Sequence, residues 1–257
     1  RGVPNVGIVV GADAALVIDT GMGERNGRLV LAAARTVSGD LPLFVMSTHV
    51  HPEHDLGAQS FPADATMIRS RSQVEEIAAD GMRVVEDFRR ASPAFAELLE
   101  GASFRPPDVV FDESSDVDLG GVSVRLIAMG ANHTPGDTIA STSDGVLFAG
   151  DLVMAGTPAL ASDLSSVDRW LRSLDALEEI GPEVIVPSHG PIGDLTFLVA
   201  YRAYFHALRA GVRDRSVAGE SLPQIVDALV REQIDRWPDA DRIEGAVRAI
   251  LREGAQT

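Results

Sequence analysis

Three of the six histidines in the 257-residue chain lie within one short segment, residues 49–54 (HVHPEH). Histidine is so scarce in this chain that such clustering would arise by chance in roughly a few sequences per thousand. Two imidazoles on a loop, His49 and His51, can hold one metal ion through ring nitrogens, and the adjacent Glu53 and His54 can turn toward a second ion. The segment therefore indicates a metal site, with a polar surface turn as the alternative.

The residue types that are absent narrow the chemistry further. The chain contains no Cys and no Lys, and all 22 of its basic residues are Arg. A thiol nucleophile, a Cys-ligated zinc, a disulfide and a catalytic or phosphate-loop lysine are therefore excluded. A Ser-His-Asp hydrolase would have Ser47 or Ser188 available, but no Gly-x-Ser-x-Gly turn occurs and the histidines of 49–54 would be left unexplained.

The charge balance argues against a nucleic-acid partner. The formal net charge is −16 and the pI is near 4.7, whereas phosphate binding needs clustered cations. Hydrophobic residues make up 45% of the chain, and no apolar run approaches the roughly 20 residues that span a bilayer. We therefore expect a soluble protein without a membrane partner, built as one large domain or a domain with an appendage.

The cellular compartment is left open by the sequence. Residues 1–3 lead almost directly into strand-like sequence, so we expect the natural chain to begin further upstream. An export signal in that upstream part would make the protein periplasmic, and its absence would make it cytoplasmic.

Short strand-like runs end just before the candidate residues. Residues 6–10 and 14–18 form a predicted hairpin followed by Asp19, and a buried strand at 43–46 leads into 49–54. Further strands are expected at 65–68, 109–111, 115–119, 122–127, 138–142, 146–148 and 183–186, and helices at 24–37, 70–100 with an interruption at 92–93, 164–180, 225–237 and 243–251. This order is consistent with two sheets flanked by helices, with the site at the strand ends.

Five sequence blocks occur in the order and at the spacing of one known family. They are residues 17–21 (VIDTG), 47–54 (STHVHPEH), 132–137 (NHTPGD), 147–151 (LFAGD) and 186–190 (VPSHG). In these blocks the chain resembles the metallo-β-lactamase superfamily. One block would be weak evidence, whereas five in order are specific. His206 lies outside every block and is expected to be an ordinary helix residue.

The resemblance implies a fold and a metal centre. The implied fold class is α/β, a four-layer αββα sandwich over residues 1–199 with a helical C-terminal extension over 200–257 packed on it. The implied cofactors are two Zn²⁺ ions, with iron or manganese as alternatives. The implied ligands are His49, His51 and His133 for the first ion, Glu53, His54 and His189 for the second, and Asp151 as a bridge between both.

Such a metal centre implies hydrolysis. A hydroxide between two cations forms near neutral pH and attacks a carbonyl or phosphoryl centre without a protein nucleophile. Glu53 and Asp151 are the candidate catalytic residues among the ligands. Asp19, Thr48 and Asp137 are expected to stand behind the ligands and fix the imidazole tautomers, with an ordinary turn or cap role as the alternative.

Glu53 departs from the family pattern, which usually has Asp at this position. The extra methylene moves the carboxylate by about 1.5 Å, whereas metal–ligand distances tolerate only about ±0.2 Å. An adjusted backbone, a weaker second site and a preference for another metal are the three outcomes left open.

The expected substrate is a small molecule with an ester-like bond: a lactone, a thioester or a lactam. A one-iron oxidoreductase similar to sulfur dioxygenases and a non-catalytic metal-binding protein are the alternatives, and a homodimer is left open. The helices of 70–100, with Phe88, Phe95 and the nearby Phe104, are a candidate lid, although Phe at helical spacing more often fills a core. The loop 155–159 is a second candidate wall, and neither segment offers an evident cationic clamp.

Overall fold

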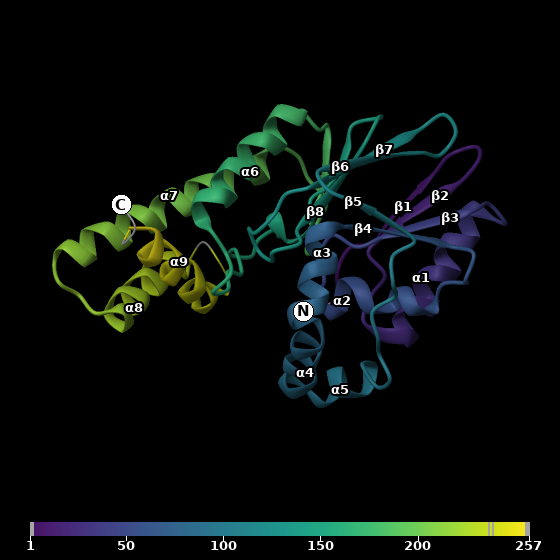
Figure 1. Ribbon diagram of the computed structural model, residues 1–257. Coiled ribbons are helices and arrows are strands. Elements are labelled where there is room, and N and C mark those ends of the chain that lie inside the picture. The colour runs from purple at the N-terminus through teal and green to yellow at the C-terminus, as the bar shows by residue number, and fades with distance from the viewer. Residues whose placement is uncertain (1–2, 236, 238, 255–257) are drawn as a thin grey trace.

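Two five-stranded β-sheets stack face to face at the centre of the structure, a computed structural model that describes residues 3–235, 237 and 239–254 (Figure 1). The first sheet consists, in spatial order, of β1 (Gly7–Val10), β2 (Ala15–Ile18), β3 (Leu43–Met46), β4 (Thr66–Ser70) and β5 (Val109–Phe111). β1 and β2 form the predicted antiparallel hairpin, and the strands from β2 to β5 are parallel to one another.

The second sheet is mostly antiparallel. Its strands are β6 (Ser114–Asp118), β7 (Ser123–Ala128), β8 (Thr138–Thr142), β9 (Val146–Phe148) and β10 (Val184–Val186), in the spatial order β10-β9-β8-β7-β6. Only β9 and β10 pair in parallel within this sheet. As a result β7, β9 and β10 run in the same direction, and their carboxyl ends reach the same edge of the sheet.

Alternating side chains build two apolar layers on the first sheet. Along β2, Leu16 and Ile18 point to the second sheet and join a cluster with residues of β7 and β8. Ala15 and Val17 point the other way, where α1 (Gly23–Ser38) covers the sheet through Ala34 and its neighbours. Because both faces are buried, the strand reads as a continuous apolar run bounded by turn residues, and that run is the local signal by which it can be predicted from sequence.

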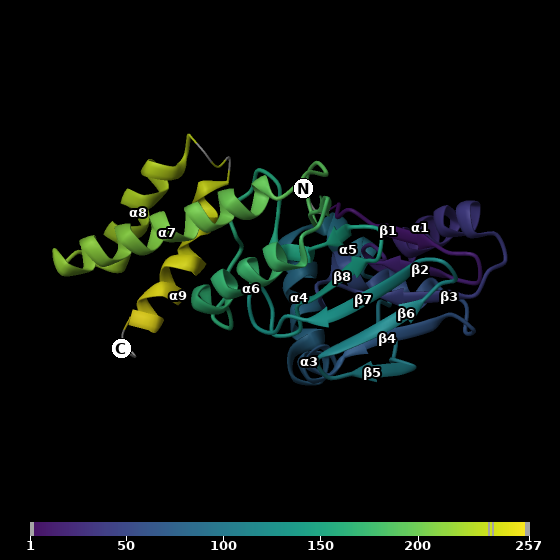
Figure 2. The ribbon, with the colours of Figure 1, turned by 90° about the horizontal axis from the view of Figure 1, so that it is seen from above.

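The second sheet is covered on its outer face by α6 (Val167–Ile180). Ser166 caps this helix by accepting a hydrogen bond from the amide of Arg169, and Gly181 ends it with a left-handed φ of +68°. The predicted start at residue 164 was therefore three residues early. Trp170, fully buried, packs with side chains of β8 and β9. The predicted four-layer αββα sandwich is confirmed (Figure 2).

The helical segment between β4 and β5 is more divided than predicted. It contains α3 (Arg71–Glu76), a π-helical turn (Ile77–Gly81), α4 (Met82–Ala91) and α5 (Pro93–Leu98). The predicted break is confirmed at Ser92, which is extended and caps α5 through the amide of Ala94. These helices pack through Val85 and Leu99 against Met22 and Leu56 at the rim of the first sheet.

The C-terminal helices pack against α6 on the far side of the second sheet (Figures 1 and 2). They are α7 (Thr196–Val217), α8 (Leu222–Gln233) and α9 (Glu244–Gly254). The predicted helix 225–237 therefore ends at Gln233, and its residue 236 lies outside the described residues. α7 spans the predicted boundary between residues 199 and 200, and the division into two domains stays a prediction.

None of the helices in the described part of the chain combines the length and the apolar character that crossing a membrane requires.

Tyr201 of α7 connects the C-terminal helices to the loop that follows β9. Its buried hydroxyl accepts a hydrogen bond from the amide of Met154 at 3.0 Å and donates to the carbonyl of Thr157 at 2.8 Å. One side chain thereby satisfies two backbone groups that would otherwise be buried without partners.

We expect Tyr201→Phe to lower the free energy of unfolding by about 1–3 kcal/mol, because it leaves these backbone groups unsatisfied. Tyr204→Phe is the matched control, since the Tyr204 hydroxyl is buried with no hydrogen-bond partner among the described residues. Urea unfolding curves measure both variants. Equal stability losses in the two variants would contradict the assigned role of the Tyr201 hydroxyl.

Candidate metal centre

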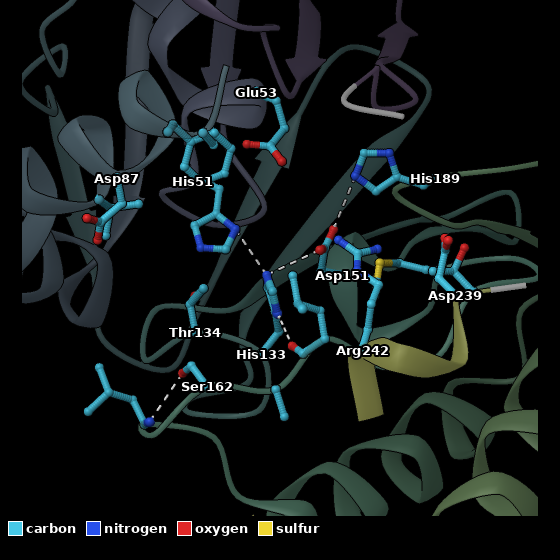
Figure 3. Close-up of a pocket in the computed structure, with 18 of the residues that line it drawn as sticks. His51, Glu53, Asp87, His133, Thr134, Asp151, Ser162, His189, Asp239 and Arg242 are labelled. Atoms are coloured by element: carbon cyan, nitrogen blue, oxygen red, sulfur yellow. Dashed lines mark hydrogen bonds and ion pairs between the residues drawn. The ribbon is translucent and has the colours of Figure 1, made fainter. Parts of the chain in front are cut away.

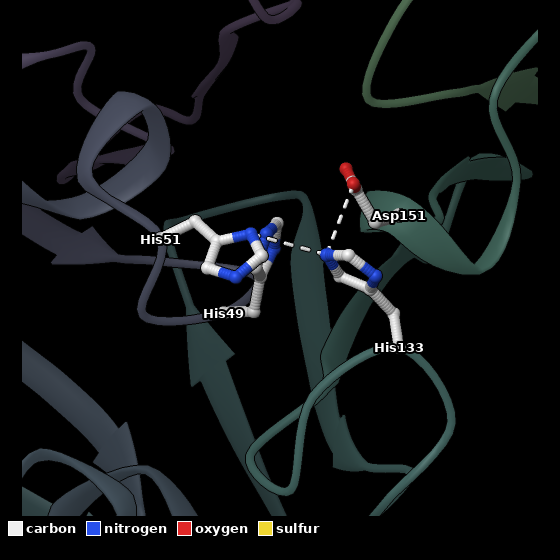
Figure 4. Close-up of side chains that lie close together, drawn as sticks. All are labelled: His49, His51, His133 and Asp151. Carbon is white, nitrogen blue, oxygen red and sulfur yellow. Dashed lines mark hydrogen bonds and ion pairs between the residues drawn. The ribbon is translucent and has the colours of Figure 1, made fainter. Parts of the chain in front are cut away.

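The seven predicted ligands all follow the carboxyl ends of strands. His49, His51, Glu53 and His54 come after β3, and the other three come after β7, β9 and β10 of the second sheet. The same edge therefore receives side chains from both sheets. The structure brings the seven together into two adjoining groups: His49, His51, His133 and Asp151 in one, and Glu53, His54 and His189 in the other, with one potential ligand atom of each residue within 4.8 Å of the others in its group (Figure 4 shows the first group).

A short helix gives the segment 49–54 its shape. Residues that precede a proline favour extended backbone, and Pro52 is itself well suited to the first position of a helix. His51 is accordingly extended, and α2 (Pro52–Asp55) begins directly after it. Asp55 anchors this helix by a fully buried ion pair with Arg69 of β4, in which Nη2 and Oδ1 are 2.8 Å apart. The turn separates the His49–His51 pair from Glu53 and His54.

Asp151 lies between the two groups. Its Oδ2 is 3.2 Å from Nε2 of His133, and its Oδ1 is 3.6 Å from Nε2 of His54 and 3.9 Å from Nε2 of His189 (Figure 3). Burial on its own raises the pKa of this carboxyl, but the facing imidazoles outweigh burial and hold the pKa well below its usual range. The side chain is therefore an anion within reach of both groups.

Asp19 holds Thr48 and the ring of His54 in position from the side away from the cluster. It follows β2 with a left-handed φ of +63°, which is rare for residues other than glycine and tolerated best by Asn and Asp. Its Oδ1 accepts from the amide of Thr48 at 2.7 Å, and its Oδ2 accepts from the Thr48 hydroxyl at 3.0 Å and from Nδ1 of His54 at 2.8 Å. Although burial lowers the pKa of His54, the Asp19 carboxylate raises it overall to about 9.

Outer partners orient three further imidazoles. Nδ1 of His49 donates to the Thr48 hydroxyl at 3.2 Å, Nδ1 of His133 donates to the carbonyl of Leu160 at 2.6 Å, and Nδ1 of His189 donates to the carbonyl of Val3 at 3.2 Å. Each of these rings therefore turns its Nε2 lone pair toward the cluster. Thr48 and Asp19 occupy the places expected of them behind the ligands.

Of the two roles expected for Asp137, the structure shows the turn role and not the contact with an imidazole. Its carboxylate accepts from the amide of His133 at 2.7 Å and from the amide of Thr134 at 3.0 Å, so it shapes the loop and does not touch an imidazole. The carbonyl of Leu160 takes the position that we expected for Asp137. A backbone acceptor has no signature in a sequence, which is why it was missed.

Several buried polar atoms in the two groups have no hydrogen-bond partner among the described residues. They are Nε2 of His49, Nε2 of His54, Oε2 of Glu53 and Oδ1 of Asp151. Nε2 of His49 and the two carboxylate oxygens are buried acceptors, which are costly unless a cation satisfies them. The raised pKa of His54 keeps its Nε2 protonated at neutral pH in the metal-free protein, and a bound cation would replace that proton. Burial and the neighbouring histidines hold the pKa values of His49 and His51 well below 6.5, so both rings are neutral, as metal ligation requires. The donor set therefore fits divalent cations.

Glu53 still reaches the second group despite its extra methylene. Its carboxylate lies with His54 and His189, and burial raises its pKa. The position within α2 sets the start of the side chain, and the longer side chain closes on the same group.

A cavity of about 790 Å³ opens over both groups. Phe88 and Phe95 line one wall, and the Phe88 ring centre is 5.5 Å from that of His51, so these two residues support the expected lid. Both also pack on the apolar cluster below, and Phe104 belongs to that cluster alone. The predicted second wall is present in part through Ala155 and Thr157.

Two further features of this pocket were missed from the sequence. Arg83 of α4 and Arg242 of the C-terminal region line the cavity, so the lid helices do bring one cation to it, although the sequence showed no evident cationic clamp. Glu76 of α3 also lines it, where its Oε2 accepts from the amide of Gly136 at 2.8 Å. Their helical surroundings gave no local signal, because only long-range packing brings them to the cavity.

Comparison with known proteins places this fold and site in context. A family model described as the metallo-beta-lactamase superfamily matches residues 1–189. The acyl-coenzyme A thioesterase MBLAC2 of Bos taurus is 26% identical over 205 residues, which cover 72% of this chain and 72% of the thioesterase.

Two further similar proteins are alkylsulfatases. A linear primary-alkylsulfatase of a Pseudomonas species is 25% identical over 207 residues, which cover 68% of this chain and 39% of the sulfatase. The solved structure of the inverting sec-alkylsulfatase Pisa1 from Pseudomonas sp. matches with a TM-score of 0.76 at 17% identity, over 98% of this chain and 48% of that one. The chain thus spans less than half the length of each sulfatase, and the second match shows the fold alone.

We expect Asp19→Asn to weaken metal binding by about 10- to 100-fold, because an amide cannot accept from both Thr48 and His54. Asn tolerates the left-handed backbone, so the turn is kept. Competition with a chromophoric chelator measures the affinity. Asp116→Asn, which removes an exposed carboxylate of β6, is the control. Unchanged affinity in Asp19→Asn would contradict the positioning role.

The buried carboxyl of Glu76 makes the stability of the metal-free protein depend on pH. In the metal-free protein, burial raises the pKa of Glu76 from 4.5 to about 7. Between these pH values the folded state holds a proton that the unfolded chain has lost, so the free energy of unfolding falls as pH rises through this window and is constant above it.

Glu76→Gln removes this titration while keeping an acceptor for Gly136. Relative to the wild type, we expect the variant to gain on the order of 2 kcal/mol of stability between pH 4.5 and pH 8. Urea unfolding in chelator at both pH values measures the difference. The exposed neighbour Glu75→Gln is the control. A Glu76→Gln profile parallel to the wild-type profile would refute the expectation.

Proposed function

Because the chain belongs to the metallo-β-lactamase superfamily, we propose that it is a metal-dependent hydrolase that cleaves a small ester-like bond. One observation carries this proposal: buried ligand atoms without hydrogen-bond partners converge at the floor of a cavity large enough for a small-molecule substrate. Thioesters and lactones are the first substrates to test.

The proposed first metal site consists of His49, His51 and His133, and the proposed second site of Glu53, His54 and His189, with Asp151 shared. Two Zn²⁺ ions suit these nitrogen and oxygen donors, and iron or manganese would suit them as well. When bound, two such cations polarise the scissile carbonyl or sulfuryl group and lower the pKa of a coordinated water to near neutrality.

The protein's own residues hold the proposed ligands in position. Asp151 remains ionised between the two groups, and Asp19 holds His54 through Nδ1 so that its Nε2 stays directed inward. Thr48 and the Leu160 carbonyl hold the other rings in the same way. Fixed ligands lose little free energy to reorganisation when the charge on the substrate changes during the reaction.

The walls of the cavity support an acyl or alkyl group beside the scissile bond. Phe88, Phe95, Leu160 and Leu164 give apolar surface next to the cluster. The relatives are consistent with this reading, since one is named for cleaving acyl-coenzyme A and another for cleaving alkyl sulfates. A cavity of about 790 Å³ leaves room for such a group but not for a macromolecule.

The metal content of the purified protein tests the proposal first. We expect close to two metal ions per chain, and a large loss in His51→Ala, because this variant removes a ring at 3.1 Å from Nε2 of His133. His206→Ala, on the exposed face of α7, is the matched control and should retain the wild-type content. Elemental analysis reports both the amount and the identity of the metal.

Hydrolysis of thioesters, lactones and lactams by the same preparations completes the test. Activity should fall by at least about a hundredfold in His51→Ala and be unchanged in His206→Ala. A single iron would direct attention to an oxygen-dependent oxidoreductase. Retained metal without activity on any ester-like substrate would favour a non-catalytic metal-binding protein, and absence of metal after reconstitution would refute the proposal.

A further inference from the structure

The cavity contains two arginines with different surroundings. Arg83 is engaged by Asp80, with Nε and Oδ1 2.8 Å apart, and by Asp87, with Nη1 and Oδ2 3.4 Å apart. Arg242 forms no ion pair with any side chain that the structure describes. In Figure 3 its side chain rises from the yellow C-terminal ribbon into the cavity on the side of Asp151. Among the described residues that line the cavity, Arg242 is therefore the cation whose charge remains available to a ligand.

The backbone around Arg242 is anchored close to the site. Arg242 belongs to a 3₁₀ turn (Ala240–Ile243) whose two end side chains are fully buried. Gly245, at the start of α9, lies so close to the cavity loop that a Cβ there would be 1.8 Å from the carbonyl oxygen of Ala161. The absence of a side chain at Gly245 allows this contact, which holds the turn over the cavity. Arg242 also lies beyond residues 1–189, the part that matches the family model.

Five of the described residues that line the cavity carry carboxylates: Glu53, Glu76, Asp87, Asp151 and Asp239. All five are engaged by other groups or belong to the proposed metal sites. Glu76 accepts from the amide of Gly136 at 2.8 Å, and Asp239 has an interaction partner of its own. Asp87 is engaged by both Arg83 and Arg90. Asp151 and Glu53 belong to the proposed metal sites, where divalent cations would more than offset their charge. With these groups compensated, the planar guanidinium of Arg242 presents its donors to the cavity in a geometry that matches an oxyanion.

We propose that Arg242 binds an oxyanion, such as a carboxylate, that the substrate carries away from its scissile bond. The C-terminal helices would then supply a specificity residue to the site on the sandwich. This inference rests on the proposed function, because it assumes that the ester-like bond is cleaved at the metal centre. The favoured substrates are acyl esters or thioesters with an acidic group on the acyl chain, such as half-esters of dicarboxylic acids.

Two esters that differ in one charge test the proposal. The metal-loaded wild type should cleave mono-4-nitrophenyl glutarate with a higher kcat/KM than the neutral 4-nitrophenyl pentanoate. In Arg242→Gln we expect kcat/KM for the glutarate ester to fall about tenfold, which corresponds to about 1.4 kcal/mol, and kcat/KM for the pentanoate to stay within about twofold.

Two control variants separate recognition from general effects. Arg83→Gln removes a charge from the same cavity but one already paired, and Arg248→Gln removes an exposed arginine of α9 that pairs with Glu244. Both should leave the preference for the glutarate ester within about twofold of the wild type. Equal losses on both esters in Arg242→Gln, or an unchanged preference, would overturn the proposal.

A third substrate tests whether Arg242 binds the scissile group, and a calorimetric measurement tests whether it binds a carboxylate in the absence of cleavage. Slower cleavage of 4-nitrophenyl sulfate in Arg242→Gln, with the glutarate ester unaffected, would place the anion at the scissile group and overturn the proposal. Calorimetric binding of monomethyl glutarate to the metal-loaded protein should weaken about tenfold in Arg242→Gln. If the wild type cleaves neither these esters nor any thioester, lactone or lactam, the proposed function fails, while the calorimetric result still decides whether Arg242 binds the carboxylate.

Discussion

The site depends on keeping one carboxylate, Asp151, ionised in the buried seam where the rims of two sheets meet. Burial favours protonation, and only the imidazoles and any cations around Asp151 can offset that cost. These groups come from both sheets, so both rims have to approach one side chain. Gly150 permits the approach: its φ is +55°, and a Cβ there would lie 2.8 Å from Cβ of Thr48. An ionised Asp151 therefore requires that the strand ends of both sheets converge on it, and this convergence requires a glycine at position 150.

The cluster is unfavourable by itself and is held in place by the rest of the fold. It contains unpartnered buried atoms, and Asp19 behind it adopts a backbone conformation that few residues tolerate. Such features persist only where the surroundings determine the position of each residue. Here Leu16 and Ile18, just before Asp19, are locked into the core between the sheets. The sandwich thereby holds the cluster of buried polar side chains in place. A bound cation would satisfy the atoms that have no hydrogen-bond partner and so lower the free-energy cost of burying them.

What the sequence could predict follows from the range over which each interaction acts. β3, β8 and β9 were predicted with their observed bounds, because short runs of β-forming residues and the turn residues around them are local signals. The candidate ligand segment was predicted because His49, His51 and His54 lie within six residues of one another. The Leu160 carbonyl and Glu76 were missed, since both meet the His133 loop only after distant segments have packed. Gly150 was also missed, because the approach of Thr48 becomes visible only in three dimensions.

The C-terminal helices illustrate the same limit with a functional consequence. Their amphipathic pattern predicts packing and nothing more, yet Tyr201 holds the Met154–Thr157 loop and Gly245 contacts the loop at Ala161. Both loops border the cavity above the ligands. The proposed metal centre is thus formed at the two sheet rims, while part of the cavity wall is formed by helices outside the matched region of the family model. Substitutions in these helices can therefore change the shape and charge of the cavity without moving a proposed metal ligand. Substrate preference could then change while the residues proposed to carry out the reaction stay in place.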